Sequence, residues 1–480
     1  MRTLIALLAV FLSGCIEDAL PSIEIGGRKP RELVIVTKVG ATTYSSGEAA
    51  SDRGFDHDLA QRFVKELGLR SRVIVARNDA EVRAHLLAGD ADLAAAWQVP
   101  TEAGELPQTV AYFDSQDVLV THEASLPLDG VEQLDGKMVH VIAGSRQEDA
   151  LNAIKKAVPG LIVVPERGMT ELDLMYGVAN HRFEATLVNN AEFDIGSNYY
   201  PELQNALLVG PPRPIVWLFS EKAGQEYLDK ADAFLARMQA SGEMARLKDR
   251  YFGHVDRLTQ ADSVRFIQDV RLVLPRFRSQ FQQAQTTTGI DWRLLAALAY
   301  QESKWQPLAT SATGVRGMMM LTEDTADKLG VNNRLDVEES ILAGARYLDS
   351  LRDGMPTTIS EPDRTWMALA AYNLGMGHLN AARYIAKTVE ADPDSWFEMK
   401  KVLPLLAQPR YYKRLKSGRG RGGEAVIMAE NVRMYHDILR QYEPAYQPFG
   451  ATETLAENEA GDLRRPLVEL TAPALQSAMP

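Results

Sequence analysis

The chain has few of the residues on which disulfide, metal and nucleotide chemistry depend. It contains a single cysteine, Cys15, so no internal disulfide can form. Its eight histidines show no paired His-x-x-x-His spacing, and no Gly-x-x-x-x-Gly-Lys phosphate loop occurs. We therefore expect no metal and no other cofactor.

Excess positive charge is also missing. The sequence holds 52 Lys and Arg against 64 Asp and Glu, which gives a net charge of −12 at pH 7. Nucleic acid is not an expected partner, because its phosphates repel an acidic protein. The one dense basic stretch runs from Arg410 to Arg421 beside glycines at 418, 420, 422 and 423. This composition favours a solvated loop, and the alternative is contact with peptide carboxylates.

Long apolar runs are absent after the N-terminus. Residues 1–15 (MRTLIALLAVFLSGC) combine one basic residue, about ten apolar residues and small residues before the cysteine. This pattern predicts an export signal, because a membrane-spanning helix needs roughly 20 apolar residues. The stretch from Leu12 to Cys15 resembles a bacterial lipobox. The resemblance implies lipid attachment at Cys15 and, since Ile16 follows, anchoring at the periplasmic face of the outer membrane. The alternative is a plain secretory signal.

With 480 residues, the chain suits two domains better than one. After an expected linker at 16–30, short β-branched runs alternate with amphipathic helices as far as residue 255. The first set comprises Leu33 to Thr37, Phe55 to Leu67 and Arg72 to Ala76; the second comprises Lys137 to Ile142, Ala150 to Lys156, Ile162 to Val164 and Ala185 to Val188. Two such sets predict a two-lobed α/β domain over 31–255.

This segment resembles the family 3 periplasmic solute-binding proteins. The matching stretches, in order, are Gly54 to Ala60, Leu87 to Leu93, Leu134 to Ser145 and Gly242 to Lys248. A helix starting near Ser145 would offer backbone N–H groups to an anionic ligand. The family's carboxylate-clamping Arg is missing, because residues 97–104 read WQVPTEAG. We therefore do not expect ordinary amino-acid uptake.

Further along, Leu294 to Lys304 (LLAALAYQESK) predicts a buried helix that carries Glu302 at its C-terminal end. Partial burial raises the pKa of a carboxyl group, so Glu302 could donate a proton near neutral pH. The nearby acids Glu323, Asp324, Asp336, Glu338 and Glu339 are predicted to begin helices, where the helix dipole favours them.

The region from Phe266 to Tyr442 resembles the catalytic domain of the soluble-lytic-transglycosylase family. The resemblance rests on Glu302-Ser303, on a glycine-framed loop at 314–322 (GVRGMMMLT), and on Ala371-Tyr372-Asn373. It implies a mainly α lysozyme-like domain over 266–445, with Glu302 as the single acid and base. It implies that substrate is bound by Ser303, Met318, Met319, Met320, Tyr372, Asn373 and Glu424. The sequence departs from the family at Met320, where the family has Gln, and at Met428, where it has Tyr.

A single Glu suffices if the substrate supplies its own nucleophile. The resemblance implies a lyase that cleaves the MurNAc-GlcNAc β-1,4 bond of peptidoglycan strands and leaves 1,6-anhydromuramoyl ends. The alternatives are a goose-lysozyme-like hydrolase, which would need a carboxylate that activates water, and a non-catalytic peptidoglycan-binding sensor. Because a hinged binding fold precedes this cell-wall enzyme, we expect the domain at 31–255 to sense a cell-wall peptide or muropeptide. The alternative is a spacer or docking domain. The composition of residues 451–480 predicts a disordered tail.

Overall fold

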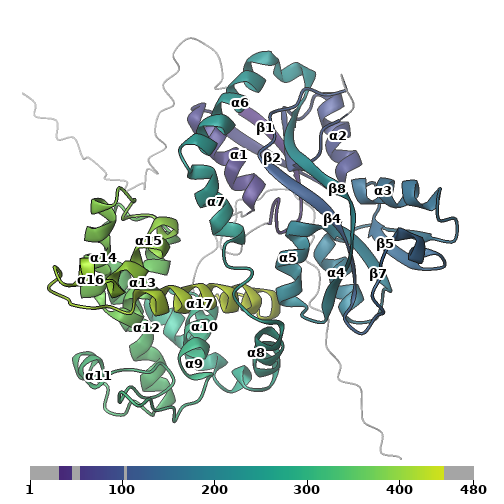
Figure 1. Cartoon of the computed structure of the whole chain (residues 1–480). Helices are drawn as coiled ribbons and strands as arrows, with labels where there is room; N and C mark the ends of the chain where they lie inside the picture. The colour runs from purple at the N-terminus through teal and green to yellow at the C-terminus, as the bar shows by residue number, and fades with distance from the viewer. Residues whose placement is uncertain (1–31, 46–53, 102–104, 448–480) are drawn as a thin grey trace, which may run out of the picture. The chain divides into compact units, whose positions relative to one another are not determined.

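The structure, a computed structural model, describes residues 32–45, 54–101 and 105–447 (Figure 1). The predicted signal peptide at 1–15 with Cys15, the linker at 16–30 and the tail at 451–480 lie outside the described residues. We describe two parts of the chain, the binding-protein-like region (residues 32–255) and the helical region (residues 260–445).

The binding-protein-like region is built on one eight-stranded sheet of order β2-β1-β3-β8-β4-β7-β5-β6. Parallel pairs join β1 to β2 and β3, and β5 to β6 and β7. The long β8 runs antiparallel to both β3 and β4, and β4 runs antiparallel to β7, so β8 and β4 together link the two parallel groups. The strands are β1 (Glu32–Lys38), β2 (Arg70–Ala76), β3 (Leu93–Gln98), β4 (Phe113–His122), β5 (Met138–Ile142), β6 (Ile162–Glu166), β7 (Ala185–Asn189) and β8 (Leu203–Phe219).

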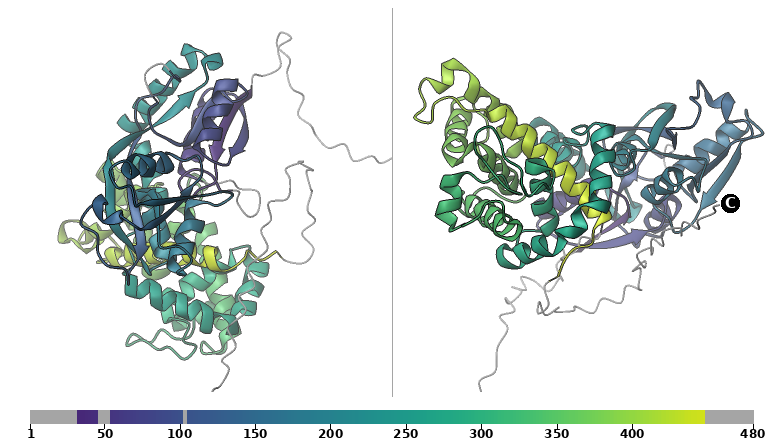
Figure 2. Two further views of the ribbon diagram at one scale, coloured as in Figure 1. Left: turned by 90° about the vertical axis from the view of Figure 1, so that its right-hand side faces the viewer. Right: turned by 90° about the horizontal axis from the view of Figure 1, so that it is seen from below.

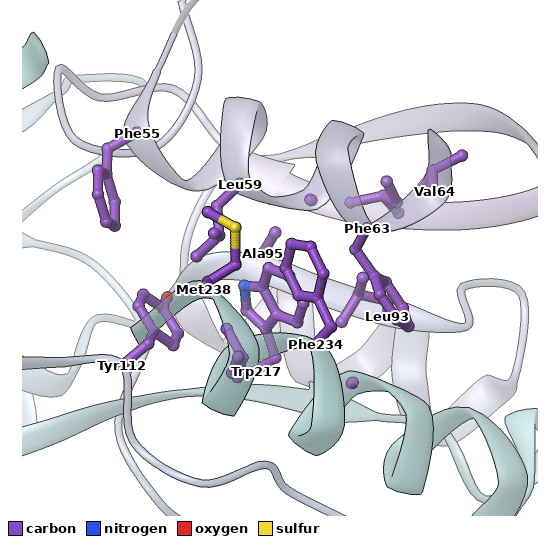
Figure 3. Packing of buried hydrophobic residues seen from close by; sticks show 14 of the residues in the cluster. Phe55, Leu59, Phe63, Val64, Leu93, Ala95, Tyr112, Trp217, Phe234 and Met238 are labelled. Atoms are coloured by element: carbon purple, nitrogen blue, oxygen red, sulfur yellow. The ribbon is translucent and has the colours of Figure 1, made fainter. Parts of the chain in front are cut away.

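Helices cover both faces of each half, so the region has two lobes with separate cores. In lobe 1, around β1 to β3, Leu33 and Ile35 face a core shared with α1 and α6. Figure 3 shows part of this core, where Phe63 of α1 and Phe234 of α6 lie beside Trp217. Val36 faces a second core with α2. Lobe 2, around β5 to β7, likewise has a core on each face. The helices are α1 (Phe55–Glu66), α2 (Asp79–Ala88), η1 (Val131–Leu134), α3 (Arg146–Lys155), α4 (Glu171–Ala179), α5 (Asn190–Tyr199), η2 (Glu221–Ala223), α6 (Gln225–Ala240) and α7 (Glu243–Phe252).

Polar side chains cap several of these helices at their N-terminal ends. The Ser145 side chain accepts from the backbone N–H of Glu148 and caps α3, as the sequence predicts. The helix begins earlier than the apolar run at 150–156 indicates, because polar residues form its first turn. Asn78 caps α2 in the same way.

Among the residues described, the helical region consists of α-helices and 3₁₀ turns, apart from two isolated antiparallel bridges that join Arg316 to Thr310 and to Leu321. Its elements are α8 (Gln260–Leu272), η3 (Leu274–Arg276), α9 (Arg278–Thr288), α10 (Trp292–Ser303), α11 (Glu323–Leu329), α12 (Val337–Asp353), α13 (Asp363–Leu374), α14 (Met376–Thr388), α15 (Trp396–Val402), η4 (Leu403–Ala407), α16 (Pro409–Tyr412) and α17 (Gly422–Tyr442). The long α17 packs against α10 and α13, and Figure 2 shows it as one unbroken helix. The acids Glu323, Glu338 and Glu339 lie in first helical turns, as predicted.

Within the described ranges, no helix is both long enough and apolar enough to cross a membrane.

Candidate active site

Glu302 lies in the last turn of α10, a helix buried almost all round. Its residues from Trp292 to Tyr300 are all buried, and the Asp291 side chain caps its start by accepting from the backbone N–H of Arg293. The helix ends at Lys304, whose backbone is left-handed with φ of 53°. A helix held by packing on every side fixes the position of the carboxyl group at its end.

Burial raises the pKa of Glu302 to about 7. No other charged group among the described residues contributes to this shift, and the carboxyl group makes no hydrogen bond to them. The nearby ring is Tyr372, whose pKa is held well above its usual range, first by burial and then by the charge of Glu302. The arrangement leaves a single carboxyl group that can carry a proton at neutral pH.

The glycine-framed loop after α10 is fixed by backbone geometry. Gly317 has φ of +85°, and a Cβ there would lie 1.8 Å from the carbonyl oxygen of Arg334. No other residue type fits at that position. The adjacent backbone is held by three side-chain hydroxyls. Ser303 donates to the Met318 carbonyl at 2.8 Å, Tyr372 donates to the Met319 carbonyl at 2.8 Å, and Ser340 accepts from the Met319 N–H at 3.2 Å.

The structure brings Glu302, Ser303, Met318, Met319 and Tyr372 together, but not all of them present side chains to substrate. Ser303 is 6% exposed, and Met318 and Met319 are fully buried. Their side chains pack beneath the loop, because apolar side chains at these positions complete the core. In this structure Ser303 holds the loop in place, and the two methionines support it from below.

The remaining predicted substrate residues lie nearer the surface. Met320 is half-buried with φ of 48°, and Asn373 is exposed at the end of α13. Glu424 is exposed in the first turn of α17, where its carboxylate pairs with Arg421 at 3.2 Å. Met428, which replaces the family tyrosine, is buried at 4% exposure.

Two residues that contact the loop or Tyr372 are absent from the sequence-based set. Ser340 binds the loop from α12, and the Tyr347 ring lies 5.2 Å from that of Tyr372. Both are ordinary helix residues whose importance depends on tertiary contacts, so no sequence pattern distinguishes them.

A second candidate site lies between the lobes of the binding-protein-like region. The cavity there has a volume of about 30 Å³, enough for a water molecule. Its lining includes the charged residues Lys38, Asp79, Glu171 and Glu192. Most of the cleft is therefore filled by the chain's own side chains.

Asp79, at the start of α2 in lobe 1, occupies the anion-binding position of this cleft. Its Oδ2 accepts from the backbone N–H of Arg146 at the start of α3 in lobe 2, at 3.1 Å. Its Oδ1 accepts from Lys38 Nζ at 2.6 Å and from Gln98 Nε2 at 2.8 Å. Burial acts to raise the pKa of Asp79, but the Lys38 ammonium and these hydrogen bonds outweigh it and hold the pKa below its usual value. The sequence predicted a helix start that could bind an anion, but not that Asp79 would be that anion.

Two further carboxylates face the same cavity. Glu192 Oε1 accepts from both the N–H and the hydroxyl of Thr42, each at 2.7 Å, which ties lobe 2 to lobe 1. Its Oε2 has no partner among the described residues. Burial, reinforced by the charge of Glu192, raises the pKa of Glu171. The cavity is thus lined by three carboxyl groups, those of Asp79, Glu171 and Glu192, and by two cationic side chains, Lys38 and Arg77.

In the part of the chain that the structure describes, no group of three or more His, Cys, Asp and Glu residues could hold a metal ion.

Comparison with known proteins agrees with this division of the chain. Residues 34–254 match the model for bacterial extracellular solute-binding proteins, family 3, and residues 279–395 match the model for the transglycosylase SLT domain. A protein of Methylobacillus flagellatus named membrane-bound lytic murein transglycosylase F is 40% identical over 454 residues, covering 93% of this chain and 96% of the relative. A protein of the same name from Nitrosospira multiformis is 39% identical, covering 92% and 93%.

The chain belongs to the membrane-bound lytic murein transglycosylase F family. For this member of the family, the SLT match includes Glu302, the loop at 314–322 and Tyr372-Asn373, and it ends before Glu424. It also excludes α17, which nevertheless packs on α10.

Solved structures also resemble the binding-protein-like region. One is an ancestral arginine-binding protein bound to arginine, with 21% identity, a TM-score of 0.42, and coverage of 46% of this chain and 98% of that one. Another is the arginine-, lysine-, histidine-binding protein ArtJ from Geobacillus stearothermophilus, with 18% identity, a TM-score of 0.40, and coverage of 46% and 96%.

Proposed function

We propose that this protein is a peptidoglycan lytic transglycosylase that uses Glu302 as its only acid and base. The observation that carries the proposal is one buried carboxyl group, with its pKa raised to about 7, at the end of a rigid helix within a matched SLT domain. The names of the relatives support peptidoglycan as the substrate.

The reaction we propose divides into two proton transfers. Protonated Glu302 donates to the glycosidic oxygen as the bond between MurNAc C1 and that oxygen breaks. The N-acetyl oxygen of MurNAc stabilises the positive charge that develops at C1. The Glu302 carboxylate then accepts the proton of the sugar's 6-hydroxyl as that oxygen attacks C1, which forms a 1,6-anhydromuramoyl end. The Glu302 proton is restored and no water is consumed.

The surroundings of Glu302 support this route over hydrolysis. An inverting glycosidase places a second carboxylate roughly 6.5–9.5 Å from the acid to activate water. At Glu302, burial alone accounts for the raised pKa, and no second carboxylate of the described residues contributes to it. A nearby charged carboxylate would raise the pKa further by repulsion.

The test is digestion of purified sacculi by the chain beginning after Cys15, beside Glu302→Gln, with mass analysis of the released fragments. We expect 1,6-anhydro ends from the parent and a loss of rate of about 10³-fold or more in the variant. Reducing muramic acid ends would identify a hydrolase. If the parent releases nothing while still binding sacculi, the protein is a non-catalytic sensor.

We further propose that the mature chain is a lipoprotein anchored by Cys15 at the periplasmic face of the outer membrane. The lipobox-like residues 12–15 and the family name support this proposal. Cys15→Ala should release the protein from outer-membrane fractions, and mass spectrometry of the parent should show an acylated N-terminal cysteine. An unmodified parent that is recovered in the soluble periplasm would contradict the proposal.

We also propose that the cleft between the lobes senses a cell-wall peptide or muropeptide and alters the cleavage rate. The proposal rests on the match to the family 3 solute-binding model and on polar groups at the cleft that lack partners, including Glu192 Oε2. Because the cavity holds about 30 Å³, the lobes must separate to admit a peptide.

Calorimetry of muropeptides with the Glu302→Gln chain tests this sensing role without consuming the ligand. Binding that is lost in Thr42→Ala/Glu192→Gln, together with a ligand-dependent cleavage rate in the parent, would support sensing. Absence of binding to any wall fragment would favour a spacer.

A further inference from the structure

A cavity in the helical region lies beside α10, and its lining does not include Glu302. Its volume is about 540 Å³. It is lined by Arg265 and Asp269 of α8, by Arg276 and Phe277 at the end of η3, and by the turn that follows α10, from Lys304 to Ala309. We call it the α8 pocket.

The α8 pocket carries excess positive charge in a protein whose net charge is −12. Three cationic side chains, Arg265, Arg276 and Lys304, line it together with one carboxylate, Asp269. Asp269 accepts from the Tyr300 hydroxyl at 2.8 Å. Arg265 and Arg276 are exposed, and within the described chain neither guanidinium makes an ion pair or a side-chain hydrogen bond. Two guanidinium groups are thus available to an anion.

Lys304 is the third cation of the pocket, and two tyrosine rings hold its ammonium group in place. Its ammonium lies 4.4 Å from the centre of the Tyr300 ring and 5.0 Å from that of Tyr435, and it donates to the Tyr435 hydroxyl at 3.2 Å. Lys304 and Trp305 both have left-handed backbones, with φ of 53° and 54°. Non-glycine residues rarely adopt this conformation, so two in succession indicate a turn imposed by its surroundings. Burial lowers the pKa of Lys304, so a bound anion would stabilise its charged form.

One wall of the α8 pocket also contacts the glycine-framed loop at 314–322. Lys304 follows Glu302 by two residues, which places their Cα atoms about 5 Å apart on opposite sides of the helix end. Ala309, at the far end of the pocket wall, accepts through its carbonyl from the Gly317 N–H at 2.9 Å. The same short segment therefore forms one wall of the pocket and supports the loop beside Glu302.

We propose that the α8 pocket binds a carboxylate of the peptide stem of peptidoglycan while the glycan strand lies at Glu302. The inference rests on the proposed function. A planar guanidinium suits a carboxylate because it can donate two parallel hydrogen bonds. Apolar groups such as Phe277 and Leu308, the latter 74% exposed, would contact the aliphatic parts of a peptide. A stem of four residues spans up to about 14 Å, enough to pass round the helix end.

The experiment compares kcat/KM of the anchor-free chain on glycan strands that carry stems and on the same strands stripped by an amidase. In Arg265→Gln/Arg276→Gln, the preference for stem-bearing strands should fall about 10-fold, mainly through KM. The effect should shrink at high salt. Arg70→Gln is the matched control, because Arg70 is an exposed Arg at the start of β2, outside the pocket.

The outcomes separate a failure of the pocket proposal from a failure of the proposed reaction. An unchanged preference in the double variant, or an equal loss of kcat/KM on both substrates, would overturn the pocket proposal. If the parent cleaves neither substrate, the proposed function fails. Calorimetry of a synthetic stem tetrapeptide with Glu302→Gln, with and without the two Arg substitutions, then still tests the pocket. A loss of affinity that depends on the two arginines supports the pocket, and unchanged affinity contradicts it. Inhibition of cleavage by that free tetrapeptide would support the pocket only if it is lost in Arg265→Gln/Arg276→Gln, because a peptide bound between the lobes could also alter the rate.

Discussion

The two parts of the chain each contain a functionally placed carboxyl group, and burial affects the two differently. Glu302 in the helical region has no hydrogen-bond partner among the described residues, and its pKa is raised to about 7. Asp79 in the binding-protein-like region is more completely enclosed, at 3% exposure, yet its pKa is lowered.

The two pKa values shift in opposite directions because the two carboxyl groups differ in their hydrogen-bond and ion-pair partners. Asp79 receives hydrogen bonds from Lys38, Gln98 and the backbone of Arg146, and the Lys38 ammonium lies 2.6 Å away. These groups replace the water that burial removes, so the charged form is retained. At Glu302, no described residue supplies hydrogen bonds in place of that water. Of these two groups, Asp79 therefore forms a structural ion pair, and Glu302 can hold a proton to donate.

The largest effect on stability should come from breaking the Asp79 pair. Asp79→Asn removes the charge and leaves the Lys38 ammonium largely buried, which should cost about 3 kcal/mol of unfolding free energy. Denaturation in urea at pH 7 measures this. Lys38→Met/Asp79→Asn should recover much of the loss. A single variant as stable as the parent, or a double variant that is less stable than the single one, would show that the pair does not stabilise the fold.

The pH dependence of cleavage should show that Glu302, unlike Asp79, holds a proton near neutral pH. Because Glu302 must hold its proton to donate it, kcat/KM should fall about tenfold for each pH unit above about 7. Rate measurements between pH 5 and 9 on soluble glycan strands test this. Strand binding by Glu302→Gln serves as the control and should change little over the same interval. A constant kcat/KM up to pH 9 would mean that Glu302 is not the acid.

Removing the charge at Glu302 should stabilise the protein, the reverse of the effect at Asp79. The carboxyl pKa is higher in the folded state than its ordinary value of 4.5, so folded wild type loses stability as pH rises from 4.5 through about 7. Glu302→Gln should therefore gain roughly 2 kcal/mol at pH 8 and much less at pH 5. Thermal unfolding at both pH values measures the difference. An equal gain at both would assign the effect to packing.

The smallest expected effect tests the support beneath the glycine-framed loop at 314–322. Ser303→Ala removes the hydrogen bond to the Met318 carbonyl and should cost about 1 kcal/mol of stability, with a several-fold loss of kcat. Ser279→Ala, at an exposed serine of α9, is the control and should change stability by no more than about 0.5 kcal/mol. If kcat is unchanged in Ser303→Ala, the loop does not depend on this hydrogen bond.

Much of the fold follows from sequence periodicity and helix-capping residues. The predicted runs at 33–37, 72–76 and 185–188 lie in β1, β2 and β7, and the run at 294–304 lies mostly in α10. Local patterns suffice there, because each element needs only its own residues and a place to bury its apolar face. The raised pKa of Glu302 was also predictable, since a buried helix ending in Glu implies desolvation.

The roles of individual side chains were less accessible from the sequence. The sequence motif groups Ser303, Met318 and Met319 as substrate residues, but the structure buries all three side chains under the loop. A motif records which residues occur together along the chain and does not record which way each side chain points. Asp79 carries no sequence signal at all, because its partner Arg146 is 67 residues away.

The order of the two regions, most of their strands and helices, and Glu302 as the candidate acid can all be inferred from the sequence. These properties depend on short-range patterns of apolar, capping and turn-forming residues. Three other features are visible only in the folded protein: Asp79 fills the cleft between the lobes, Ser303 faces inward, and Arg265, Arg276 and Lys304 line one pocket. Each of these features depends on contacts between residues far apart in the chain. Packing therefore decides which buried polar groups find hydrogen-bond partners.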